Sequence, residues 1–222
     1  MNRSPHRTAT RRALFGAGVL ALVAAWLGPL PTLAQHSFAA HMAMHMGVVA
    51  VAAPLLAFGL AGSRFDPATR LPGLFSPMLA TLLEFVVVWA WHAPWLHHAA
   101  RASGAVRALE QGSFLAVGLL LWLAAFGGPR LAARGRAVAG IAALLMTAMH
   151  MSLLGVLLAG GTRPLYPHGA ASDGAPLAVA SALADQHLGG ILMLAVGGIA
   201  YLAGALWLLS GLLRPRAGGH HA

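Results

Sequence analysis

The residues best suited to chemistry lie in the segment 41–46, HMAMHM, which holds two histidines and three methionines. His41 and His45 are four residues apart, so on a helix they share one face, one turn apart. Two imidazoles at this spacing can chelate a single metal ion. Met42 and Met46 form a second pair at the same spacing, about 100° around the helix. Thioether sulfur favours Cu(I) and imidazole also suits copper, so the segment predicts a copper site.

Other side chains that could bind a metal follow in separate segments. His92 and His150 lie within or beside apolar runs, while Asp185 and His187 add a carboxylate and an imidazole further along. Each has a second interpretation, because a histidine at a membrane interface can be a polar cap, and methionine in an apolar helix commonly fills the core. The same two interpretations stay open for three more histidines: His97, His98 and His168.

The composition indicates the environment in which these residues work. Of the 222 residues, 59% are apolar and 9% are charged, against about 25% charged in soluble domains. With a mean hydropathy of +0.74, the chain is expected to be a membrane protein. The chain has no cysteine, so a soft metal would have to be bound by histidine and methionine. The basic residues are spread along the chain and form no patch of the kind that binds nucleic acid.

A transmembrane helix needs about 20 mostly apolar residues, and six segments qualify as candidates: 13–34, 43–62, 75–96, 109–126, 137–159 and 186–209. The sequence therefore predicts an all-α, polytopic transmembrane helix bundle of about six spans. The connections between the spans are short except for 160–185, whose glycine and proline content predicts an irregular loop.

The N-terminal segment has two interpretations. Its twin arginines, apolar core and Thr-Leu-Ala before Gln35 also describe an export signal, whose cleavage would leave five spans. We accordingly divide the chain into a helical or signal-like segment 1–34, a membrane bundle 35–214 and a cytoplasmic tail 215–222.

The arginines predict how the bundle is oriented. With both termini cytoplasmic, 11 of the 14 arginines lie inside, as the positive-inside rule requires. Nine of the 12 histidines then collect at the outer face. One acidic residue, Glu84, is expected in mid-span, where a carboxyl group must be neutral or paired. Either a proton or cation relay or a structural link between helices would explain it.

Three blocks of the sequence together resemble the CtaG family of cytochrome c oxidase assembly factors. The first block is 41–59, HMAMHMGVVAVAAPLLAFG; the second, 91–122, begins WHAPWLHH; the third pairs 153–167, ending RPLYP, with 185–194, DQHLGGILML. The chain departs from the family pattern at Glu110 and Gln111, where members often carry histidine, and in its six spans against about seven.

The resemblance implies a multi-pass protein of the bacterial inner membrane that is not an enzyme. It would help to mature a caa-type oxidase by delivering copper to the catalytic subunit, alone or with other assembly factors. The resemblance favours His41, His45, His92, Asp185 and Gln186 as site residues.

Two other functions remain open at this stage. A membrane b-type cytochrome would use His41 or His45 with His92 or His150 as axial haem ligands. A copper transporter would need polar groups along a path to the inside, and Glu84 is the one such group in the predicted spans.

Overall fold

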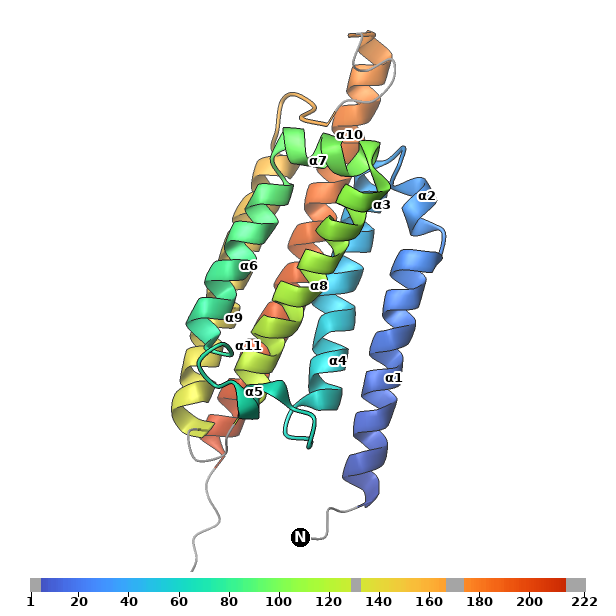
Figure 1. The fold of residues 1–222 in the computed structure, drawn as a ribbon. Coiled ribbons are helices and arrows are strands. Elements are labelled where there is room, and N and C mark those ends of the chain that lie inside the picture. Colours follow the sequence, from blue (N-terminus) through green and yellow to red (C-terminus); the bar gives the residue numbers. More distant parts are fainter. Residues whose placement is uncertain (1–4, 129–132, 167–173, 215–222) are drawn as a thin grey trace, which may run out of the picture.

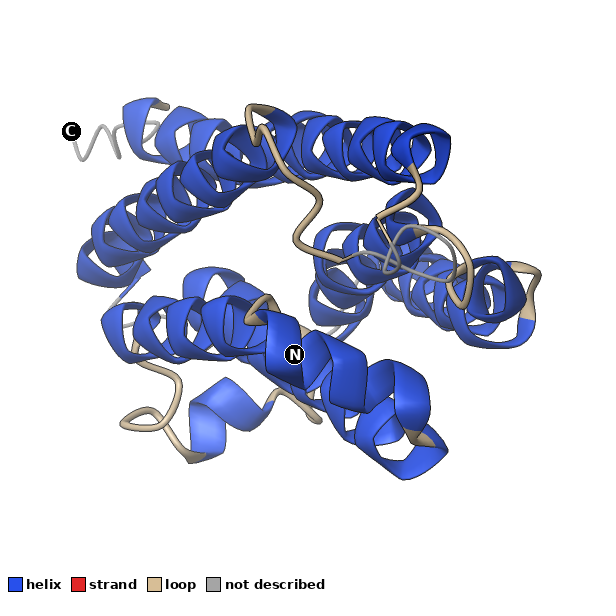
Figure 2. Cartoon of the chain, turned by 90° about the horizontal axis from the view of Figure 1, so that it is seen from above, coloured by secondary structure: helices blue, strands red, loops and turns tan. Residues whose placement is uncertain are grey.

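The computed structural model describes residues 5–128, 133–166 and 174–214. These residues form helices and connecting turns, with no strand among them (Figures 1 and 2). The long helices run alongside one another in one bundle (Figure 1). The predicted all-α class is therefore confirmed. The predicted tail 215–222 and His168 lie outside the described residues.

The helices have these bounds: α1 (Pro5–Leu27), α2 (Leu30–Leu33), α3 (Phe38–Met46), α4 (Ala53–Leu60), α5 (Pro67–Arg70), α6 (Pro77–Trp91), α7 (Pro94–Ala102), α8 (Gly104–Phe126), α9 (Ala133–Ala159), α10 (Pro176–Leu192) and α11 (Gly198–Leu213). Two π-helical segments, η1 (Gly47–Ala52) and η4 (Met193–Gly197), join α3 to α4 and α10 to α11. Five helices are long and apolar enough to cross a membrane, and a sixth span results if the bent pair α6–α7 counts as one. This agrees with the predicted number of spans.

The third predicted span, 75–96, is not one straight helix. The helix α6 ends at Trp91, and α7 leaves it at an angle of 73°. Pro94 explains the break, because a proline disfavours helical backbone in the preceding residue, and Ala93 is extended with ψ 129°. The bend turns α7 across the end of the bundle, as Figure 1 shows.

The predicted irregular loop 160–185 is wrong over its second half. The helix α10 begins at Pro176 and continues through residue 185. Proline is well suited to the first turn of a helix, and the segment that follows is rich in alanine, the strongest helix former. The segment was predicted as one irregular loop because the glycines and prolines before Pro176 outweighed the helix-forming residues after it.

The π-helical segment η1 follows the HMAMHM segment directly. Pro54 lacks a backbone N–H and its ring would clash with the carbonyl group one turn earlier. The Ala53 N–H instead bonds the carbonyl group of Val48, five residues back. This wider turn sets the rotation of α3 relative to α4.

The two ends of the bundle differ in their contents. The helices α2, α3, α7 and the start of α10 gather at one end, whereas α5 and the end of α11 lie at the other (Figure 1). The first end contains the HMAMHM segment and corresponds to the predicted outer face.

Candidate metal centre

A hydrogen-bonded cap fixes the start of α3, which carries the first two histidines. The Asp185 carboxylate accepts hydrogen bonds from the backbone N–H groups of Phe38 and Ala39 and from the Ser37 hydroxyl. The Ser37 hydroxyl in turn accepts one from the Ala40 N–H. A carboxylate at a helix N-terminus satisfies unpaired donors and interacts favourably with the helix dipole. Asp185, predicted as a metal ligand, thus lies where it ties α10 to α3.

Three buried side chains from three helices come together just below this cap. His41 of α3, His97 of α7 and Glu110 of α8 each place one possible ligand atom so that all three atoms lie within 4.8 Å of one another. The His41 Nε2 is 3.2 Å from the Glu110 Oε1. Glu110 has no exposed surface, and His97 is 1% exposed. Two imidazoles and a carboxylate are a donor set that suits several transition metals, copper among them.

His45 and His92 extend this group deeper into the bundle. The His45 ring centroid lies 5.5 Å from that of His92 and 6.4 Å from that of His41. The His45 side chain is fully buried, and neither of its ring nitrogens has a hydrogen-bond partner among the described residues. Buried polar groups in proteins are nearly always paired, so an orphaned imidazole requires an explanation.

The second ring of this pair is already oriented. The His92 Nδ1 is 2.6 Å from the Val88 carbonyl oxygen, one turn earlier. The Nε2, also buried, has no hydrogen-bond partner in the part of the chain that is described. A histidine that binds a metal typically donates its other ring N–H to a carbonyl or carboxylate oxygen. His92 therefore has the arrangement of a ligand that is ready to bind.

Two aromatic rings pack against His97. Tyr166 stacks on Phe38 with ring centroids 4.4 Å apart, and it lies 4.5 Å from the His97 ring. Its hydroxyl donates a 2.7 Å hydrogen bond to the His92 carbonyl oxygen. Burial raises the pKa of the Tyr166 hydroxyl, so it remains a donor at neutral pH. This bond holds the bend after α6 against the segment that contains Tyr166.

Two cavities lie beside the cluster, and one of them borders His41. A cavity of about 10 Å³ is lined by His41 together with Arg101 and Arg107. Next to it, a pocket of about 320 Å³ is bordered by Arg107, Gln111 and Trp26. The Gln111 side-chain amide donates to the Glu110 Oε2 at 3.3 Å, and the Trp26 Nε1 donates to the Gln111 Oε1 at 3.3 Å. These bonds fix the second carboxylate oxygen of Glu110 and leave its first facing His41.

The other predicted ligands lie elsewhere. Met42 and Met46 pack beside Gly189 and Gly197 of the last span, away from the imidazoles. The His150 ring packs against Phe85, and a ring nitrogen of His187 is 2.8 Å from the Gly161 carbonyl oxygen. Gln186, favoured by the resemblance, accepts a hydrogen bond from the Leu165 N–H and donates one to the Leu158 carbonyl oxygen. Of the predicted set, the structure brings together His41, His45 and His92.

Sequence reasoning missed two members of the group. Glu110 entered the sequence analysis only as a departure from the family pattern, and His97 had two interpretations, a polar cap or a ligand. The one available signal was the resemblance itself, which placed Glu110 where histidine was expected. Nothing in the spacing of His97 distinguishes it from the exposed His98 beside it.

Glu84 has a different environment in the middle of the bundle. The Tyr201 hydroxyl donates to its Oε1 at 2.7 Å, and the Thr147 hydroxyl donates to its Oε2 at 3.1 Å. Thr81 continues the chain, 2.7 Å from the Thr147 hydroxyl. These bonds join α6, α9 and α11, as a structural link would.

Comparison with known proteins adds to this geometry. Neither the curated proteins nor the solved structures include a match to the chain. Residues 1–215 match the family described as cytochrome c oxidase caa3 assembly factor (Caa3_CtaG). This match spans every helix described above. The chain therefore belongs to the caa3-type cytochrome c oxidase assembly factors.

Proposed function

We propose that the protein binds a copper ion transiently at His41, His45, His92, His97 and Glu110 and passes it to a subunit of cytochrome c oxidase during assembly. The observation that carries this proposal is the convergence of ligand atoms from His41, His97 and Glu110 within 4.8 Å of one another. Both ring nitrogens of His150 also have no hydrogen-bond partner among the described residues, but His150 lies outside this group, whereas the fully buried and equally unpartnered His45 lies beside it. An apolar side chain would fill that space at a lower cost, because unpaired buried polar groups are destabilising. A bound ion would give the lone pair of this ring a partner.

The chemistry of the donor set supports a copper cargo. Neutral imidazoles supply lone pairs, and the Glu110 carboxylate supplies a negative charge that offsets part of the charge of the ion away from water. Imidazole and carboxylate together suit Cu(II) better than thioether sulfur would, and Met42 and Met46 face the last span instead. The site we propose is therefore less selective for Cu(I) than the sequence suggested. We propose no catalysis: the ion is cargo, and the acceptor is the oxidase.

The haem alternative ranks lower because of the packing of the rings. The His41 and His97 rings meet edge to face with centroids 4.8 Å apart, and Phe114 lies against His45. Two axial ligands must lie on opposite sides of a porphyrin, which needs a wide slot between them. A Soret band in the purified protein would favour haem over copper.

The transporter alternative ranks lower because of Glu84. Both of its carboxylate oxygens accept hydrogen bonds from neighbouring helices. A conducting path would need these bonds to be replaced by an ion.

We also propose that the cluster faces the outside of the bacterial inner membrane, with both termini in the cytoplasm. The arginine distribution supports this orientation. Reporter fusions at the C-terminus should report a cytoplasmic location. An external C-terminus would reverse the side to which copper is presented.

The functional test measures oxidase maturation in cells that lack the protein and receive variants of it. At low copper, His41→Ala and His45→Ala should reduce oxidase activity strongly, while His150→Ala, outside the cluster, should leave it near the wild-type level. Added copper should restore part of the lost activity. Blots must show equal membrane levels of all variants. Equal oxidase activity with His41→Ala, His45→Ala and His150→Ala at low copper would refute the proposal.

A further inference from the structure

A groove lies at the end of the bundle opposite the histidines, between α1, α4 and the turn that follows α4. Its volume is about 930 Å³, and its lining includes three arginines, Arg11, Arg12 and Arg64. No acidic residue lines it. The groove therefore combines a large space with an uncompensated positive charge.

The three arginines do not all have the same role. The Arg11 guanidinium donates to the carbonyl oxygens of Ala61 and Gly62, which fixes the turn to α1. Arg12 and Arg64 are exposed, and Arg64 lies over the Phe65 ring, 4.5 Å from its centroid. Within the described ranges, neither of these two forms an ion pair with a carboxylate.

The nearest acidic side chain is already occupied. The buried Asp66 carboxylate accepts hydrogen bonds from the N–H groups of Gly62, Ala68 and Gly128. It holds the turn together and cannot also neutralise the arginines without losing those bonds. A ligand of the groove would thus be an anion.

Apart from Thr8 and Ser63, the rest of the groove is apolar. Phe15 and Phe65 are 41% and 58% exposed, and Leu60 lies beside them in the lining. The close approach of α1 and α4 makes this wall continuous, because a side chain on Gly59 would meet Phe15. The surface suits an apolar chain next to a charged head.

We propose that this groove binds an anionic phospholipid of the leaflet at this end of the bundle. Arg12 and Arg64 contact the phosphate, for which guanidinium is well matched, and an acyl chain lies along Phe15 and Leu60. Basic pockets between transmembrane helices on the cytoplasmic side are known to bind such head groups. The arginine distribution assigns this end to the cytoplasm. This proposal is independent of metal binding.

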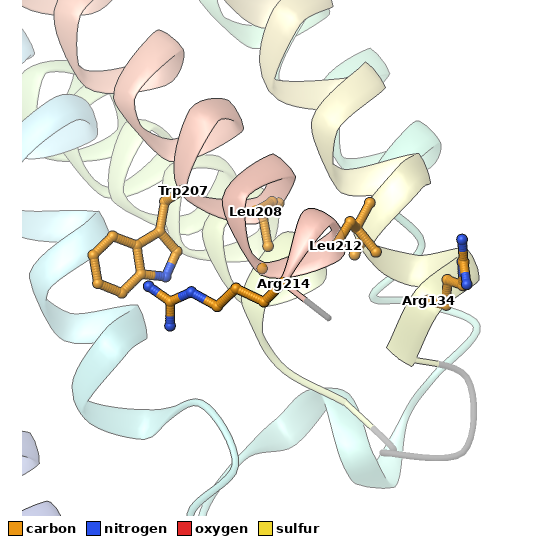
Figure 3. Close-up of a pocket in the computed structure, with 7 residues that line it drawn as sticks. Arg134, Trp207, Leu208, Leu212 and Arg214 are labelled. Carbon is orange, nitrogen blue, oxygen red and sulfur yellow. The ribbon is translucent and has the colours of Figure 1, made fainter. Parts of the chain in front are cut away.

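A second groove provides a matched control. It lies between α9 and α11, has a volume of about 510 Å³, and is lined by Arg134, Arg214 and Trp207. Figure 3 shows the Arg214 side chain extending toward Trp207, while the Arg134 side chain points away on the other side of Leu212. The two guanidinium groups do not converge, so they would not bind one phosphate together. Removing Arg134 and Arg214 takes two positive charges from this end of the bundle, as removing Arg12 and Arg64 does.

The test is native mass spectrometry of the full chain in mild detergent, titrated with phosphatidylglycerol or with phosphatidylcholine. The wild type and the Arg134→Gln/Arg214→Gln variant should bind phosphatidylglycerol in preference to phosphatidylcholine. In Arg12→Gln/Arg64→Gln this preference should fall by about fivefold per arginine removed. The Arg12→Lys/Arg64→Lys variant, which keeps the charge, should retain most of it.

Several results would overturn the proposal. One is an unchanged preference in Arg12→Gln/Arg64→Gln, and another is an equal loss in the control variant. Binding of inorganic phosphate as tight as that of phosphatidylglycerol would show an anion site that does not recognise the lipid. The intact mass also reports whether α1 is present, and a mature chain that lacks residues 1–34 would lack one wall of the groove.

Discussion

Two buried polar groups in this bundle differ in how completely they are paired. In mid-bundle, both oxygens of Glu84 accept hydrogen bonds, from Tyr201 and Thr147. At the end that contains the HMAMHM segment, His45 and the Nε2 of His92 have no such partner among the residues described. Both sets are buried in the same apolar bundle, so the environment alone does not explain the difference.

The difference indicates different roles. A polar network whose atoms are all paired rigidifies a core and specifies how its helices pack. Buried groups without partners are costly and persist where something else binds them. We therefore interpret Glu84 as a link between helices and the histidine cluster as a ligand site.

Glu84→Lys should have the largest effect, because it replaces a paired carboxyl with a cation in mid-span. We expect little protein in the membrane, since a charged residue at the centre of a span costs about 3 kcal/mol or more. Glu84→Gln keeps the shape and one acceptor, and it should accumulate. Blots of membrane fractions measure the level of each variant. Equal accumulation of the two variants would contradict a structural role for Glu84.

Glu110→Gln should come next, and its effect should be on metal binding with no loss of accumulation. The amide keeps the size of the side chain but removes the negative charge beside His41. Copper affinity should fall at least about tenfold, the loss that is typical even for a group that only supports a metal ligand. Competition titration of the purified protein against a copper chelator measures the change. Wild-type affinity would mean that Glu110 neither binds the ion nor supports His41 as a ligand.

Tyr201→Phe should affect stability alone. It removes the donor to the Glu84 Oε1 and leaves a buried acceptor unpaired, at a cost of about 1–2 kcal/mol. Thermal unfolding in detergent should show the loss, with Trp207→Phe on the lipid-facing side as the control. Copper content should stay at the wild-type value. A parallel loss of copper would show that the Glu84 network and the histidine cluster depend on each other, which contradicts separate roles.

Met42→Leu should have the smallest effect. Met42 is 1% exposed and packs beside Gly189, so leucine should fill nearly the same space at a cost below about 1.5 kcal/mol. Bound copper should be unchanged by metal analysis. A loss of copper as large as that of a histidine variant would show that the Met42 sulfur is a copper ligand.

Much of the fold was predictable because lipid imposes a simple rule on sequence. Long apolar segments must be helical to satisfy their backbone groups, so the number of spans and the clustering of histidines at one end followed from hydropathy and arginine positions. The start of α10 and the bend at Pro94 did not follow as readily. Both depend on single prolines, whose effect is local and is lost when composition is averaged over a segment.

The site was only partly predictable, for a geometric reason. The spacing of His41 and His45 places them on one face, but which partners meet that face depends on helix rotation and on the direction of α7. The bend brings His97 to His41, and the rotation of α8 turns Glu110 inward. The same rotation of α3 directs Met42 and Met46 to the last span, which their spacing alone could not reveal.

The most direct test of the central claim is the copper content of purified wild-type protein beside the His41→Ala/His45→Ala double variant and the Tyr201→Phe variant. All three should be loaded under the same limiting copper and checked for equal folding by circular dichroism. We expect copper in the wild type and in Tyr201→Phe, and almost none in the double histidine variant. Normal copper in the double variant would contradict the account, because the clustered histidines would then be no more than a polar cap at the end of the bundle.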